Sequence, residues 1–481
     1  MTSFIENQIS MLRKTFIICV SILIVISCSA QAVSQRLQQA FNIFETDVQL
    51  KTAISSLYVI DSKSGQVVFN KNSMVGMAPA STQKIITAAT AFELLGDGYG
   101  YKTWFYLDGP IRHDTLLGNF IIKGTGDPTL GSPRYDETKK EVILGAIIRM
   151  LKAKNIKVIA NDIIVDESAY ETASVPDGWI WQDIGNYYGA GAFAFNWNEN
   201  QYDMFLKAGP NEGDPVEIIK TEPELEIMAF TNELKAGPKG SGDNAYVYLP
   251  PYSVGGFVRG TIPPGANNFT ISGSIPYPAL QFSAGLGDSL ASAGILLNGR
   301  FRTSLDYQAK GKTLKYAASP FNSIVSPSLV QMTKWFLTKS INLYGEAFLK
   351  AIAFERKGFG STSDGLMYLK DFWKQKGIDD RELNMCDGSG LSPQDRVTTH
   401  AQVMILKYAK QQPWFNYYFD AFPEYNGMKM KSGTIKDVKG FCGYHTAKNG
   451  KEYIFSFLVN NYNGSTSDLI NKMYRVLNIL K

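Results

Sequence analysis

The sequence predicts a mixed α/β protein in which the two ends of the chain build one domain around a β-rich insertion. Three observations lead to this fold class: a β-hairpin pattern over 55–69, a strand and an amphipathic helix over 453–480, and a middle rich in short strands. We therefore expect a discontinuous domain from 33–100 and 316–481. The insertion spans 101–315 and is long enough for two subdomains.

The hairpin is predicted by a β-rich alternating stretch at 55–60, a turn cluster at 61–65 and a second short strand at 66–69. Near the other end, 453–459 is rich in β-branched and aromatic residues, and apolar residues recur at helical spacing over 468–480. Both chain ends thus offer the strands and helices of one α/β domain.

The middle of the chain has a different pattern. Strands are predicted at 120–122, 158–165 and 246–249, with glycine and proline clusters between them. Two helices are expected, at 141–154 and 280–294. The middle therefore reads as a β-rich insertion.

Composition excludes several classes of function. The chain has 481 residues, 44% of them hydrophobic, which is enough for a large core and about two or three domains. Its net charge of +4 and the absence of a Lys/Arg block argue against nucleic acid as a partner. With three histidines, no C-x-x-C and no obvious carboxylate pair, we predict neither a metal nor a cofactor.

The N-terminus predicts export. Two basic residues precede the apolar run 16–26, and an A-x-A sequence follows at 30–32, so that 1–32 reads as a signal peptide. The apolar run is short for a membrane span. Two processing routes stay open: cleavage after Ala32, slightly favoured, or lipidation of Cys28 in a lipobox-like sequence. Either route gives a periplasmic protein, lipid-anchored in the second case.

Two cysteines follow the signal, Cys386 and Cys442. In an exported protein they could pair, or they could be two small buried side chains. The sequence leaves both interpretations open.

Ser81 and Lys84 form an S-x-x-K sequence at the start of an apolar helical pattern that stops at Gly96. Side chains three residues apart lie on one helix face, and a helix N-terminus favours negative charge. This arrangement is typical of a serine nucleophile whose proton passes to a lysine amine. Serine is also an ordinary N-cap residue, so the tetrad alone does not decide.

Two further motifs follow in the order found in penicillin-binding proteins and serine β-lactamases. Ser340-Ile341-Asn342 matches S-x-N, and Lys431-Ser432-Gly433 matches K-[ST]-G. A second K-S-G at 63–65 lies in the predicted hairpin turn, upstream of the serine, so order and context assign the motif to Lys431.

On these motifs the chain resembles the penicillin-binding D-alanyl-D-alanine carboxypeptidases/endopeptidases with a large insertion, the low-molecular-mass class C penicillin-binding proteins. The resemblance spans nearly the whole chain after the signal, and it rests on 78–84, 124–130, 187–190, 198–200, 340–346, 387–392 and 431–434. It implies an α/β (α+β) transpeptidase domain like that of serine β-lactamases, with an antiparallel sheet flanked by helices. The family usually has Thr where Ser432 stands, and the hydroxyl is kept.

The resemblance also implies the chemistry. Ser81 attacks the penultimate D-Ala carbonyl of a peptidoglycan stem peptide, and β-lactams trap the same serine. Lys84 accepts the serine proton, which requires a pKa lowered by burial and by a second cation such as Lys431. Ser340 relays the proton to the leaving nitrogen.

The remaining motif residues are expected to bind substrate. Asn342 hydrogen-bonds the substrate's backbone amide, and Lys431 attracts the terminal carboxylate. Ser432 and Thr434 add hydroxyl hydrogen bonds on either side of Gly433, and backbone N–H groups of Ser81 and Thr434 hold the oxyanion.

Two other functions are weighed against this one. A β-lactamase would hydrolyse penicillin quickly, but the long gap between Ser81 and Ser340 argues against it. A non-catalytic peptidoglycan-binding homologue would not need the intact motifs. The preference for carboxypeptidase or endopeptidase cleavage, the third residue of the stem peptide and the oligomeric state stay open.

Overall fold

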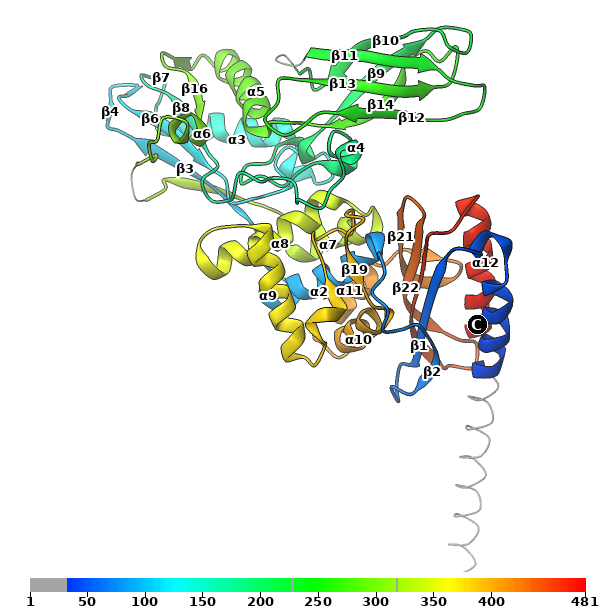
Figure 1. The fold of residues 1–481 in the computed structure, drawn as a ribbon. Coiled ribbons are helices and arrows are strands. Elements are labelled where there is room, and N and C mark those ends of the chain that lie inside the picture. The colour runs from blue at the N-terminus through cyan, green and yellow to red at the C-terminus, as the bar shows by residue number, and fades with distance from the viewer. Residues whose placement is uncertain (1–32, 226–228, 317–318) are drawn as a thin grey trace, which may run out of the picture. The chain divides into compact units, whose positions relative to one another are not determined.

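The computed structural model describes residues 33–225, 229–316 and 319–481, and this chain forms two compact units (Figure 1). The first unit comprises the described residues up to Thr82, Val397–Gln411 and Phe422–Lys481. The second comprises those within Gln83–Arg396 and Gln412–Ala421. The predicted signal peptide, with Cys28, lies outside the described residues. None of the helices in the described ranges is long and apolar enough to cross a membrane.

The first unit is built on a six-stranded antiparallel sheet with the strand order β2-β1-β23-β22-β21-β20. Both chain ends contribute strands to it, as predicted. The strands are β1 (Ile54–Asp61), β2 (Val67–Lys71), β20 (Glu424–Tyr425), β21 (Met428–Ile435), β22 (Val438–Thr446) and β23 (Glu452–Asn460).

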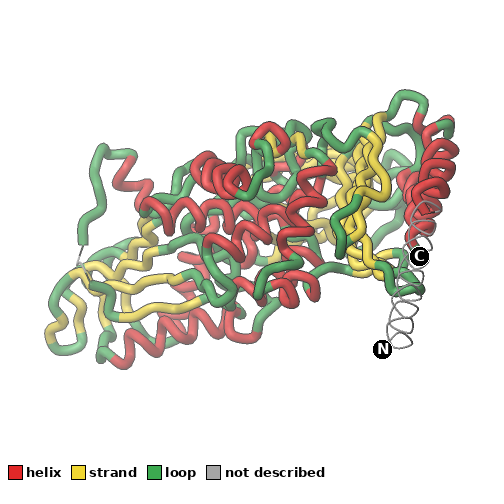
Figure 2. The backbone as a smooth tube through the Cα atoms, turned by 90° about the horizontal axis from the view of Figure 1, so that it is seen from below, coloured by secondary structure: helices red, strands yellow, loops and turns green. Residues whose placement is uncertain are grey.

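Helices flank this sheet (Figure 2). A helix over 33–45 and α12 (Thr466–Leu477) share one apolar core with the sheet residues on one face. The other face packs against α10 (Thr399–Ala409), where Ser56 of β1 hydrogen-bonds Thr399 over 2.7 Å. The predicted C-terminal helix is confirmed, with a final 3-10 turn at Asn478–Leu480.

The helical part of the second unit packs around α8 (Asn342–Lys357), as the ribbon shows (Figure 1). Most residues of α8 are buried. Helices α2 (Lys84–Leu94), α7 (Leu329–Thr338) and α9 (Thr362–Gln375) pack against it, and α11 (Phe415–Asp420) packs on α7. A helix with so little exposed surface can hold polar side chains in a dry environment.

The β-rich part of the second unit contains a five-stranded and a four-stranded sheet, both covered by α3 (Lys140–Ala153) and α5 (Pro278–Ser292). The two helices confirm the sequence prediction. The first sheet contains β3 (Lys102–Asp108), β6 (Asn119–Lys123), β8 (Ile163–Asp166), β16 (Phe301–Thr303) and β17 (Asn322–Val325). The second contains β4 (Ile111–Arg112), β5 (Thr115–Leu116), β7 (Val158–Ile159) and β15 (Leu296–Leu297).

The prediction of a single strand over 158–165 is therefore wrong. The chain breaks it into β7 and β8, which belong to different sheets. The polar pair Asn161 and Asp162 lies at the break, where the Asp162 amide donates to the Asn119 side chain over 3.1 Å.

Two three-stranded sheets complete the β-rich part and share one core. They contain β9 (Gln201–Ala208), β10 (Val216–Glu222) and β14 (Phe269–Ser274), and β11 (Ala229–Ala236), β12 (Asn244–Tyr248) and β13 (Gly255–Ile262). Short helices α4 (Trp181–Ile184) and α6 (Ser304–Gln308) lie in the connections. The β-rich middle is thus observed, and its limits as a separate domain at 101 and 315 stay a prediction.

Candidate active site

Ser81 lies in a 3-10 turn, η2 (Ala80–Gln83), rather than in the α-helix that the sequence predicted, because α2 begins only at Lys84. Ala80 before it has a φ of 47°, a left-handed backbone that costs a non-glycine residue about 1–3 kcal/mol. Such strain persists where the surroundings fix the backbone. Here the Thr82 hydroxyl donates to the Pro79 carbonyl over 2.6 Å and accepts from Gln402 Nε2 over 2.8 Å.

Gly433 brings the backbone of β21 against this turn. A Cβ at this position would lie 2.7 Å from the Pro79 oxygen and 2.9 Å from the Ser81 nitrogen. Real Cβ atoms do not approach other atoms so closely, so only glycine allows the contact. The first unit therefore joins two of the predicted motifs at Ser81 and Gly433.

The other side chains of the third motif alternate along β21, as neighbours in a strand do. Lys431 is buried, lies across from Cys442 on β22, and donates from Nζ to the Ser432 carbonyl over 2.8 Å. Ser432 is half-buried and Thr434 is exposed. Cys386 and Cys442 are free thiols.

Lys439 is a residue of this region that the sequence interpretation missed. It lies on β22 opposite Thr434, and its Nζ donates to Ser432 Oγ over 2.7 Å and to Thr434 Oγ1 over 2.8 Å. Burial lowers the pKa of Lys439 from 10.5 to about 8. Only the strand register reveals this contact, so the sequence signal was limited to a lysine six residues after Gly433.

In the second unit, Lys84 is fully buried at the start of α2. Its Nζ donates to Asn342 Oδ1 over 2.6 Å and to the Ser389 carbonyl over 2.7 Å. Burial lowers the pKa of Lys84 from 10.5 to about 7, against the opposing effect of the Asp387, Glu346 and Asp395 carboxyls. The expectation that burial lowers this pKa is thus supported.

The S-x-N motif lies at the start of α8. Ser340 has a φ of 60°, another left-handed non-glycine residue. Ile341 is the N-cap residue of α8, and Asn342 is its first residue. The Asn342 Nδ2 donates to the Tyr188 carbonyl over 2.7 Å.

Asp387 organises the turn that carries the Ser389 carbonyl. This fully buried carboxylate accepts hydrogen bonds from five donors. They are the backbone N–H groups of Ser389, Gly390 and Ser392 and the side chains of Gln83 and Trp179. Asp387 therefore has a structural role in this turn, and it fixes the Ser389 carbonyl that accepts from Lys84.

The sequence interpretation found no carboxylate cluster, and the structure corrects this. Glu346 and Asp395 are buried beside Asp387 and Lys84, and their charges interact. Burial raises the pKa of Glu346 to about 8, so the group is mainly uncharged at neutral pH. The members lie far apart in the chain, and no local spacing signals them. Among the described residues no group of three or more potential ligands is arranged to hold a metal ion.

Two other residues, Asp127 and Lys63, lie in turns. Asp127 accepts from the N–H and hydroxyl of Thr129 over 2.8 and 2.6 Å and so stabilises a turn. Lys63 of the second K-S-G lies exposed in the β1–β2 turn, away from β21.

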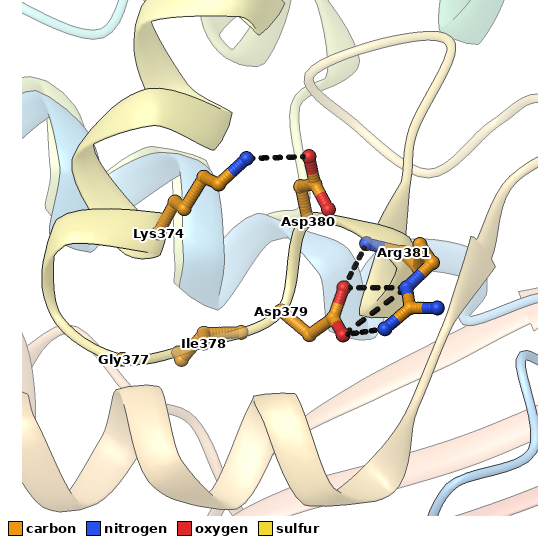
Figure 3. Close-up of a pocket in the computed structure, with 6 residues that line it drawn as sticks. All are labelled: Lys374, Gly377, Ile378, Asp379, Asp380 and Arg381. Atoms are coloured by element: carbon orange, nitrogen blue, oxygen red, sulfur yellow. Dashed lines mark hydrogen bonds and ion pairs between the residues drawn. The ribbon is translucent and has the colours of Figure 1, made fainter.

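A hollow of about 500 Å³ beside the end of α9 contains none of the motif residues (Figure 3). Its charged side chains pair with one another: Asp379 with Arg381, and Lys374 with Asp380. We assign no chemistry to it.

A helix-flanked antiparallel sheet with these three motifs defines a serine hydrolase of the penicillin-binding type. Residues 37–479 match the D-Ala-D-Ala carboxypeptidase 3 (S13) family, and the chain belongs to this family. It is a serine-type D-Ala-D-Ala carboxypeptidase.

The sequences of two related proteins match this chain over most of its length and of their own. The D-alanyl-D-alanine carboxypeptidase DacB of Haemophilus influenzae is 26% identical over 436 residues, covering 85% of each chain. A D-alanyl-D-alanine carboxypeptidase of Actinomadura sp. is 23% identical over 450 residues, covering 87% of this chain and 80% of that protein. The crystal structure of penicillin binding protein 4 from H. influenzae shares the fold, with a TM-score of 0.76, 22% identity and coverage of 89% and 97%.

Proposed function

We propose that this carboxypeptidase cleaves the bond between the two D-Ala residues of peptidoglycan stem peptides through an acyl-enzyme at Ser81. The observation that carries the proposal is the surroundings of Lys84, three residues along continuous helical backbone from Ser81. A general base must be uncharged to accept a proton, and a pKa of about 7 leaves about half of the amine uncharged at neutral pH.

The hydrogen bonds of Lys84 fit this role. A neutral amine has two N–H groups and one lone pair, whereas an ammonium group has three N–H groups. The two acceptors at Asn342 Oδ1 and the Ser389 carbonyl suit the two N–H groups of the amine. In the proposed reaction, the lone pair of the neutral amine takes the proton of the Ser81 hydroxyl.

Asn342 is oriented from both ends of its amide. Its oxygen accepts from Lys84, and one N–H donates to the Tyr188 carbonyl. The second N–H is then what Asn342 offers to a substrate, so it pairs with the carbonyl oxygen of the substrate's backbone amide. Ser340, two residues earlier, relays the proton to the leaving D-Ala nitrogen.

The oxyanion of the tetrahedral intermediate is held by the backbone N–H groups of Ser81 and Thr434. The close approach at Gly433 supports this pairing, because it puts the β21 backbone beside the Ser81 amide. Losing one such donor costs about 3 kcal/mol in comparable enzymes.

Ser432 and Thr434 bind the terminal carboxylate through their hydroxyls, and Lys431 contributes positive charge to that end of the substrate. Water resolves the acyl-enzyme.

β-Lactams resemble the D-Ala-D-Ala end and acylate Ser81. A structure of the H. influenzae penicillin binding protein 4 was determined with a β-lactam.

We further propose that the protein works outside the cytoplasm, in the periplasm, where its substrate lies. Export follows from the N-terminal signal, with cleavage after Ala32 or lipid anchoring at Cys28 as the two routes.

The test uses labelled penicillin and a peptide ending in D-Ala-D-Ala. The wild-type protein is expected to release D-alanine and to form a slowly decaying adduct at Ser81. Ser81→Ala should abolish both with the fold intact by circular dichroism, and Ser64→Ala in the second K-S-G is the matched control. Rapid penicillin turnover would instead indicate a β-lactamase, and no labelling would indicate a non-catalytic binding protein.

A further inference from the structure

Lys439 is a buried cation to which the described residues offer no counter-ion. Only 4% of its surface is exposed, and no carboxylate in the described part of the chain forms an ion pair with it. Its Nζ contacts two hydroxyls and lies 4.7 Å from the centre of the Phe441 ring. Burying a charge is costly unless it is paired, so an anionic ligand that paired with Lys439 would offset this cost.

The two hydroxyls are arranged to help an anion bind. An ammonium group has three N–H donors, and Ser432 and Thr434 take two of them. Each hydroxyl accepts from Lys439 with a lone pair and keeps its own O–H to donate. Because Thr434 is exposed and Ser432 half-buried, a ligand can reach these O–H groups. The remaining ammonium N–H and the two O–H groups together match the oxygens of one carboxylate.

Lys431 is placed differently. It precedes Ser432 on β21, so its side chain leaves the strand on the opposite face from the Ser432 hydroxyl. Its Nζ donates to the Ser432 backbone carbonyl. The charge that accompanies the two hydroxyls is therefore that of Lys439, although Lys431 belongs to the motif.

We propose that Lys439, held between Ser432 and Thr434, is the specificity-determining cation that binds the free C-terminal carboxylate of the substrate. This inference rests on the proposed function and deepens it, because a carboxypeptidase must recognise the free end of a peptide. Lys431 then adds its charge from the other face of the strand.

The experiment compares two substrates: an N-acylated peptide ending in D-Ala-D-Ala and the same peptide with a C-terminal amide. Lys439→Met should lower kcat/KM for the acid at least about 30-fold, mainly through KM, as expected for a lost buried charge pair. For the amide, kcat/KM should change less than about threefold, so the preference for the acid disappears. Lys448→Met, an exposed lysine just after β22, is the control and should keep the preference.

The inference is overturned by an equal loss on both substrates, by no loss on the acid, or by a loss of preference in Lys431→Met but not in Lys439→Met. If Lys439→Met does not fold, Lys439→Arg and Lys439→Gln replace it. The preference must then survive with arginine and disappear with glutamine. The Ser81→Ala variant distinguishes a failure of the proposed function from a failure of the role proposed for Lys439. Hydrolysis by Ser81→Ala refutes the proposed function, whereas an inactive Ser81→Ala with an unchanged preference in Lys439→Met refutes only the role of Lys439.

Discussion

Lys84 and Lys439 are two buried lysines, one in each unit, and their surroundings differ. Lys84 donates to an amide oxygen and a backbone carbonyl, with three carboxyls nearby, and its pKa lies at about 7. Lys439 donates to two hydroxyls, no carboxylate among the described residues pairs with it, and its pKa lies at about 8. Burial depresses the pKa of both.

The difference teaches that the hydrogen-bond partners, more than the pKa, decide which form of a lysine is useful. Carbonyl oxygens only accept, so they suit the N–H groups of a neutral amine, whose lone pair is proposed to take a proton. Hydroxyls accept and still donate, so two of them turn an ammonium into a three-donor site for an anion. One lysine is therefore proposed as a base and the other as an anchor.

The largest expected effect comes from making the same Lys→Arg change at both positions. Arginine stays protonated, so Lys84→Arg keeps the charge and loses the base, and acylation by labelled penicillin should slow by about 10³-fold. Lys439→Arg keeps the cation, so the preference for a free carboxylate should persist. Near-normal acylation by Lys84→Arg would contradict the role of Lys84 as base.

The next largest effect is expected in the pH dependence of kcat/KM. Along the acid and the alkaline limb of the profile, kcat/KM should change about tenfold per pH unit. For the acid substrate, kcat/KM should rise through about pH 7 as Lys84 loses its proton, and fall above about pH 8 as Lys439 loses its own. For the amide substrate the alkaline fall should be absent, because no carboxylate needs the cation. A shared alkaline limb would assign that limb to another group.

The smallest expected effect concerns stability. The pKa of Lys439 is lower in the folded state than the usual 10.5, so the folded protein is penalised for its charge below about pH 8. Lys439→Met should therefore raise the free energy of unfolding in urea at pH 7 by on the order of 1–3 kcal/mol. The gain should shrink between about pH 8 and 10.5, where stability of the wild-type protein rises. Lys448→Met should change stability by less than about 0.5 kcal/mol.

The sequence was sufficient for features that depend on local spacing. The S-x-x-K sequence, the hairpin around 61–65 and the amphipathic helix over 468–480 all follow from patterns within a few turns. The fold class and the family followed from the order of three motifs. These parts of the fold could be predicted because neighbouring residues carry the signal.

Features that depend on tertiary structure could not be predicted. The contact of Lys439 with Thr434 requires the register of β21 and β22, and a one-residue slip would abolish it. The cluster of Glu346, Asp387 and Asp395 gathers from α8 and a distant turn, and only packing brings it to Lys84. The 3-10 turn at Ser81 likewise reflects the strained approach to β21, which no propensity reveals.

Gly433 has a consequence for how this protein can change by mutation. Its backbone leaves no room for even a methyl group beside the Ser81 amide, so every single substitution there must displace the peptide of the proposed nucleophile. Position 432 is expected to tolerate exchange between serine and threonine, because the proposed contact with substrate uses only the hydroxyl. Substitution of Gly433 is expected to abolish peptide hydrolysis together with acylation by β-lactams. Variants that resist β-lactams are therefore expected to carry substitutions at other positions.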